Sequence, residues 1–114
     1  MMYGYEKQEA LAYMMKRIHE TDHPDLAGQI ESLLSQAIDA DMAYMREAGV
    51  LDEEGYAGEG YYEDDDAFEA IVEALVEAND LSADQAVKVA SLVAEYMDLQ
   101  QAYLERKGLV DWES

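Results

Sequence analysis

Apolar residues recur every three or four positions along most of the chain, which is the spacing that places side chains on one face of an α-helix. The first such segment covers residues 5–20 and precedes Pro24. A residue before proline is pushed out of the helical region, so we expect the first helix to stop there. A second apolar stripe covers residues 24–48, and Gly49 suits the end of that helix.

Two further helical segments follow in the second half of the chain. Ser82 and Gln85 have the spacing of a capping box, which marks the start of a helix, and Gly108 suits its end. No segment shows the strict alternation of apolar and polar residues that is typical of strands. The sequence therefore predicts an all-α fold in a single domain, residues 1–114, built as a small bundle of about four helices at residues 5–20, 24–48, 65–79 and 83–107.

Two segments of this bundle are unusual in composition. The helix at 83–107 is apolar on most of its surface, which is typical of a helix that lies at the centre of a fold or contacts a second copy of the chain. The loop between the second and third helices, residues 50–63, is rich in glycine, tyrosine and carboxylates. We expect the first segment to serve packing or self-association and the second to be a contact surface.

The charge of the chain excludes several classes of function. The 114 residues include 27 acidic and 7 basic ones, giving a net charge of -20, and no cysteine. Such a surface repels phosphate backbones and anionic lipids, so we expect no direct binding to nucleic acid and none to a membrane. The longest run without a charged residue or histidine is the seven residues from Ser32 to Ile38, and no signal peptide is visible. A cytoplasmic location is the default expectation.

A short histidine motif has the form of a zinc-protease signature. His19, Glu20 and His23 follow the His-Glu-x-x-His pattern, in which both histidines must lie on one face of a continuous helix. Pro24 immediately follows the second histidine and predicts a helix break at that ligand. The alternative is a helix end, with His19 near the negative end of the helix dipole and Asp22 or His23 capping the next helix. We therefore expect no metal site here.

The acidic loop has the outline of a calcium-binding EF-hand. Its twelve residues from Asp52 to Glu63 carry carboxylates at the first and last positions, but the fifth and sixth positions are Tyr56 and Ala57. An EF-hand needs an oxygen ligand at the fifth position and glycine at the sixth. No serine lies in a nucleophile elbow, and the loop glycines lie among carboxylates that would repel phosphate. We expect no enzyme activity and no cofactor, and we retain divalent-cation binding only as an alternative.

The distribution of charge is the most informative feature. No basic residue lies between Arg46 and Lys88, a stretch of 41 residues with 14 carboxylates. Within it, four carboxylates recur at helical spacing on one face of the third helix, where like charges repel. The sequence predicts a non-enzymatic protein-binding module, an adaptor or an oligomeric scaffold. The alternative is a mimic of nucleic acid that occupies the basic groove of a DNA- or RNA-binding protein.

Both interpretations predict that the partner is a protein with a basic surface. The other possibility is that the chain self-associates through the helix at 83–107. Carboxylates would meet lysine and arginine, and tyrosines would pack against the partner. The predicted contact surface combines the loop with the outer face of the third helix: Asp52, Glu54, Tyr56, Tyr61, Tyr62, Glu63, Asp66, Glu69, Glu73 and Glu77.

Overall fold

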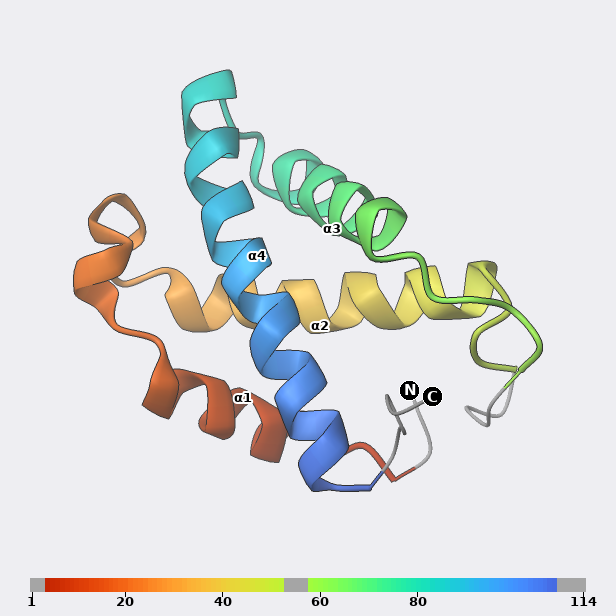
Figure 1. Cartoon of the computed structure of the whole chain (residues 1–114). Helices are drawn as coiled ribbons and strands as arrows, with labels where there is room; N and C mark the ends of the chain where they lie inside the picture. The colour runs from red at the N-terminus through yellow and green to blue at the C-terminus, as the bar shows by residue number, and fades with distance from the viewer. Residues whose placement is uncertain (1–3, 53–57, 109–114) are drawn as a thin grey trace.

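The computed structural model describes residues 4–52 and 58–108, and most of these residues lie in helices (Figure 1). In chain order the elements are α1 (Lys7–Arg17), the 3₁₀ turns η1 (Glu20–Asp22) and η2 (Pro24–Leu26), α2 (Ile30–Glu47), α3 (Asp64–Asn79) and α4 (Ala83–Arg106). This confirms the all-α bundle that the periodicity predicts. None of the described helices is long and apolar enough to cross a membrane.

The four helices pack around a crossing of α2 and α4. Both of these helices contact α3 and α1, and α3 and α1 lie on opposite sides of the point where α2 and α4 cross (Figure 1). The core is formed where the apolar stripes of the four helices meet. Its largest fully buried apolar side chains are Tyr96, Tyr103, Met14, Ile30, Leu34, Ile38, Ile71, Leu75, Leu92, Val89 and Val93.

The predicted bounds of the first two helices are wrong. The first helix is α1, and it ends at Arg17 because Ile18 adopts an extended conformation and turns its side chain into the core. The segment predicted as one helix at 24–48 divides into η2 and α2. Gly28 lies between them with φ at +81°, a left-handed conformation that a right-handed helix does not contain.

The last two helices match the prediction closely. Asp80 ends α3 in a left-handed conformation, with φ at 50°. The capping box at the start of α4 is confirmed: the Gln85 backbone N–H donates to Ser82 Oγ at 3.3 Å, and the Ser82 backbone N–H donates to Gln85 Oε1 at 3.0 Å. Gly108 follows α4 with φ at +70°, as expected for a residue just past a helix end.

The fourth helix is central to the fold, and most of its larger apolar side chains are covered by the rest of the chain. It packs against α3, α1 and α2, and its buried residues are Val89, Leu92, Val93, Tyr96, Gln100, Tyr103 and Leu104. The large apolar side chain of α4 that stays exposed is Val87, at 72%. The excess apolar surface noted in the sequence is therefore mainly buried within one chain.

The loop before α3 folds back against the end of α2. The backbone N–H groups of Gly58 and Gly60 donate to the carbonyl oxygens of Val50 and Gly49, both at 2.8 Å. A Cβ atom on Gly60 would overlap the backbone carbonyl oxygen of Ala48. Glycine is therefore required at this position by a close backbone contact, which also fixes where the chain enters α3.

Candidate functional site

The outer face of α3 carries a row of carboxylates. Asp66, Glu69, Glu73 and Glu77 are all exposed, which confirms that they share the face of α3 that points away from the core. The ion pairs among the described residues involve Asp39, Glu95, Asp25 and Glu9, and none of them lies on α3. The row of charge on α3 therefore has no cation of its own within the described part of the chain.

Part of the predicted loop surface continues this acidic row. Glu63 is exposed and immediately precedes α3, and its side chain makes no capping hydrogen bond. The Tyr61 side chain is 83% exposed, which is unusual for a large aromatic ring. Asp52 is also exposed. Glu54 and Tyr56 lie outside the residues that the structure describes.

Tyr62 differs from the other predicted contact residues because it turns inward. Its hydroxyl donates to Asp41 Oδ1 at 2.8 Å, and its ring packs edge-on against Tyr44 with 5.6 Å between ring centroids. The side chain is half-buried. Tyr62 thus anchors the end of the loop to α2 rather than presenting its hydroxyl to a partner.

Asp41 is a fully buried carboxylate at the centre of this cluster. It is 0% exposed, and its second oxygen, Oδ2, accepts from the Tyr96 hydroxyl at 2.7 Å. Burial raises the pKa of Asp41, while the hydrogen bonds from Tyr96 and Tyr62 lower it and limit the rise. Asp41 is not among the site residues predicted from the sequence. Its spacing could have indicated burial, because it lies three residues after Ile38 and four before Met45, on the apolar stripe of α2.

The histidine motif does not have the continuous helix of the zinc-protease signature. The chain leaves the helical conformation after Arg17, so His19 and His23 do not share a helical face. The His23 side chain is buried and its Nε2 lies 2.7 Å from Glu95 Oε1 on α4, which ties the η1–η2 segment to the core. Contrary to the capping alternative, no side-chain cap bond from His23 is formed at η2.

Metal binding has no further support in residues 4–52 and 58–108. These residues contain no group of three or more His, Cys, Asp or Glu side chains placed to hold one metal ion. The middle of the EF-hand outline, residues 53–57, lies outside the described residues, so this alternative stays a prediction.

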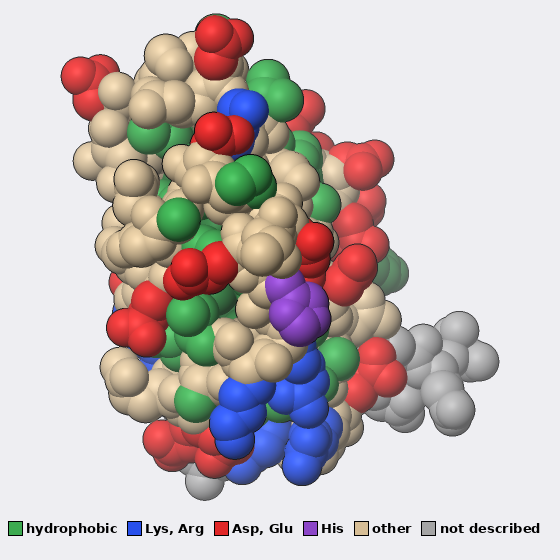
Figure 2. Space-filling view, turned by 90° about the vertical axis from the view of Figure 1, so that its left-hand side faces the viewer, with side chains coloured by type: hydrophobic (Ala, Val, Ile, Leu, Met, Phe, Trp, Pro, Cys, Tyr) green, Lys and Arg blue, Asp and Glu red, His purple; other side chains and the backbone are tan. Residues whose placement is uncertain are grey.

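A basic cluster that the sequence analysis missed lies at the other end of the molecule. Lys16, Arg17, Arg106 and Lys107 line one hollow together with Tyr13 and Glu9. Arg17 Cζ lies 3.6 Å and Arg106 Cζ 5.9 Å from the centroid of the Tyr13 ring. Figure 2 shows blue Lys and Arg side chains gathered at the lower end of the molecule. The pair Lys16 and Arg17 is far in sequence from the pair Arg106 and Lys107, and the packing of α1 on α4 brings the two pairs together.

Comparison with known proteins assigns no family, because no family model, no curated protein and no solved structure matches the chain.

Proposed function

We propose that the chain is a non-enzymatic binding protein that holds a protein partner with a basic surface through the acidic face of α3. We define this acidic face as Asp66, Glu69, Glu73 and Glu77 together with the adjoining Glu63 and Tyr61. The observation that carries the proposal is the row of four exposed carboxylates without an ion pair in the described chain. Lysine or arginine side chains of a partner would supply the missing charge.

The energetics favour a partner with positive charge. Like charges three or four residues apart on a helix destabilise it by about 0.2–0.5 kcal/mol for each pair, so the three neighbouring pairs on α3 together cost about 1 kcal/mol. A basic partner would remove this repulsion when it binds. Complementary charge at an interface mainly accelerates association and selects the partner, so binding should weaken as salt is added.

The packing of α4 supports this proposal over self-association. Most of the larger apolar side chains of α4 are buried in the chain's own core, which reduces the apolar surface that this helix offers to a second copy. A net charge of -20 on each copy also opposes association of identical chains.

The proposal is tested by comparing two variants of equal charge. In the first, Glu69, Glu73 and Glu77 on α3 are replaced by glutamine. In the matched control, the exposed Glu20, Glu31 and Glu105 on other elements are replaced in the same way. Both triple variants and the parent are immobilised, exposed to a lysate of the source cells at about 0.05 M and 0.5 M NaCl, and the captured proteins are identified by mass spectrometry.

We expect a protein with a basic surface to be captured by the parent and by the control variant, and to be lost both from the α3 variant and at high salt. Capture of the same proteins by the α3 variant would refute the proposal. Added duplex DNA distinguishes the two types of partner. Competition by DNA would identify a mimic of nucleic acid, whereas unchanged capture would identify an adaptor that binds a basic protein surface of another kind.

A further inference from the structure

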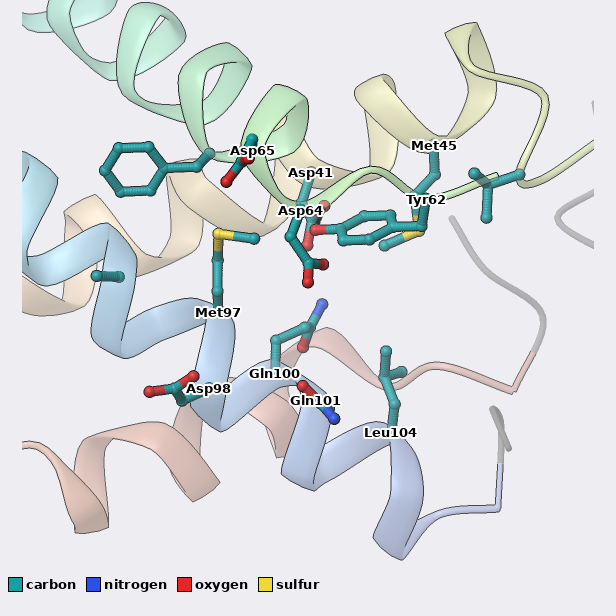
Figure 3. A pocket seen from close by; sticks show the side chains of 13 residues that line it. Asp41, Met45, Tyr62, Asp64, Asp65, Met97, Asp98, Gln100, Gln101 and Leu104 are labelled. Atoms are coloured by element: carbon teal, nitrogen blue, oxygen red, sulfur yellow. Dashed lines mark hydrogen bonds between the residues drawn. The ribbon is translucent and has the colours of Figure 1, made fainter. Parts of the chain in front are cut away.

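A cavity of about 280 Å³ lies where α2, the end of the loop, α3 and α4 meet (Figure 3). Its volume is near the lower limit for sites that bind small molecules. The cavity lies beside the first turn of α3 and is separate from the acidic face, since none of Glu69, Glu73 and Glu77 lines it.

The interior of this cavity presents a hydrogen-bond donor without a partner. Gln100 on α4 is 3% exposed, and its Oε1 accepts from the Tyr5 hydroxyl at 2.7 Å, which fixes the orientation of the amide. The amide also lowers the pKa of Asp41, but its Nε2 makes no hydrogen bond of normal length and angle with a described residue. Figure 3 shows this nitrogen turned toward Asp41 and Asp64.

An unpartnered buried amide N–H is uncommon because the donor has lost its water without gaining another acceptor. A ligand that brings an oxygen atom to Gln100 would supply this acceptor. The interior of the cavity therefore specifies a hydroxyl or carbonyl group.

The rim of the cavity favours a positively charged group. Asp64 and Asp65, in the first turn of α3, and Asp98 on α4 line the cavity and are exposed, and no basic residue is among the lining side chains. An anion would be repelled here. Because no three of the described carboxylates are placed to hold one metal ion, the charge suits an organic cation better than a metal.

The walls between the rim and the interior are apolar. Met45, Met97 and Leu104 lie along the cavity in Figure 3, and such side chains pack against hydrocarbon. The site is thus acidic at the rim, apolar along its walls and hydrogen-bonding inside.

We infer that this cavity binds a small organic cation, an alkylguanidinium or alkylammonium whose chain ends in a hydroxyl or an amide carbonyl. The cation faces Asp64, Asp65 and Asp98, the hydrocarbon chain contacts Met97 and Leu104, and the oxygen accepts from Gln100 Nε2. This binding does not depend on the proposed function, because the cavity and the acidic face use different carboxylates.

Three matched probes test each part of the inference. 4-Guanidinobutyramide carries both the cation and the carbonyl. n-Butylguanidinium keeps the cation and lacks the carbonyl, whereas 4-ureidobutyramide keeps the carbonyl and is neutral. Each probe is titrated into the isotope-labelled full chain at low salt, and binding is followed by NMR through the side-chain amide signals of glutamine.

We expect 4-guanidinobutyramide to shift the Gln100 amide signals and to bind about tenfold more tightly than either control probe, a difference of about 1.4 kcal/mol. The Asp64→Asn/Asp65→Asn variant should bind it about tenfold more weakly, while Glu73→Gln/Glu77→Gln, with the same change of charge, should bind it as the parent does. Gln100→Leu should abolish the preference for the amide over n-butylguanidinium.

Three results would overturn the inference. The first is no saturable binding of 4-guanidinobutyramide to the folded parent. The second is equal weakening by both double variants, which would mean attraction to net charge alone. The third is tight binding of the neutral 4-ureidobutyramide, which would exclude a role for the rim carboxylates. Circular dichroism of each variant establishes that it is folded before its binding is compared. If Gln100→Leu does not fold, the comparison of Asp64→Asn/Asp65→Asn with Glu73→Gln/Glu77→Gln still tests the inference.

Discussion

The two hydroxyl groups that hold Asp41 differ in their surroundings, and this difference makes a sharp prediction. Tyr96 is fully buried and donates to Asp41 Oδ2 at 2.7 Å, so its hydroxyl is not in contact with solvent. Tyr62 is only half-buried and donates to Oδ1 at 2.8 Å. We predict that Tyr96→Phe destabilises the fold more than Tyr62→Phe, although each variant loses one hydrogen bond to the same carboxylate.

The magnitudes follow from the cost of losing a hydrogen bond to a charged group. For Tyr96→Phe the lost donor leaves a buried carboxylate oxygen without a partner, which costs about 2–3 kcal/mol. For Tyr62→Phe water can solvate the exposed side of the site, and the expected cost is about 0.5–1.5 kcal/mol. The two free energies of unfolding should therefore differ by about 1–2 kcal/mol at neutral pH.

The free energy of unfolding should also depend on pH, because Asp41 gains or loses a proton. Burial raises the pKa of Asp41 in the folded chain above its unfolded value. The protonated form is thus favoured by folding, and this contribution to stability is present below the unfolded pKa and lost as pH rises through the folded pKa. Tyr96→Phe removes a donor to the charged form, so its cost should be larger above the folded pKa of Asp41 than below it.

Urea unfolding followed by circular dichroism measures these free energies. Urea is preferred because it adds no ionic strength to a chain of net charge -20. Asp41→Asn is the control: in that background the pH dependence of the Tyr96→Phe cost should disappear. Equal costs for the two tyrosine variants, or a Tyr96→Phe cost that does not change with pH, would refute this account of Asp41.

Two further predictions concern local backbone structure. Gly60→Ala should lower the free energy of unfolding by about 1–3 kcal/mol, because its Cβ meets the Ala48 carbonyl oxygen, and an unchanged urea midpoint would contradict this close contact. Ser82→Ala should cost about 1 kcal/mol, because the Gln85 backbone N–H loses its capping partner, and thermal unfolding of the variant should begin at a lower temperature unless the cap contributes nothing.

The features that the sequence predicted well are those determined by residues close together in the chain. The helical spacing of apolar residues can be recognised within a few turns of one segment. The capping box likewise involves only Ser82 and Gln85, which are three positions apart. The end of the first helix before Pro24 was predicted for the same reason, but the helix ends earlier, at Arg17, so that His19 and His23 both lie outside it. The exposure of the carboxylates on α3 followed from their shared spacing.

The features that were missed depend on residues far apart in the chain. Asp41 lies 21 residues from Tyr62 and 55 from Tyr96, so its two partners could not be inferred from local spacing. An acidic residue is expected at the surface by default, and Asp41 was counted among the carboxylates rather than placed in the core. The left-handed conformation of Gly28 and the cavity beside Gln100 likewise arise from how the helices pack.

The separation of charge between the two ends of the molecule gives the chain a large electric dipole. The acidic face lies on α3, in the upper part of Figure 1, whereas Lys16, Arg17, Arg106 and Lys107 gather at the lower end. Near a positively charged surface such a dipole experiences a torque that turns α3 toward that surface before contact. At about 0.1 M salt this field extends only about 10 Å, so the reorientation occurs during the final approach. A captured chain would then carry four of its seven basic residues on the side directed away from its partner.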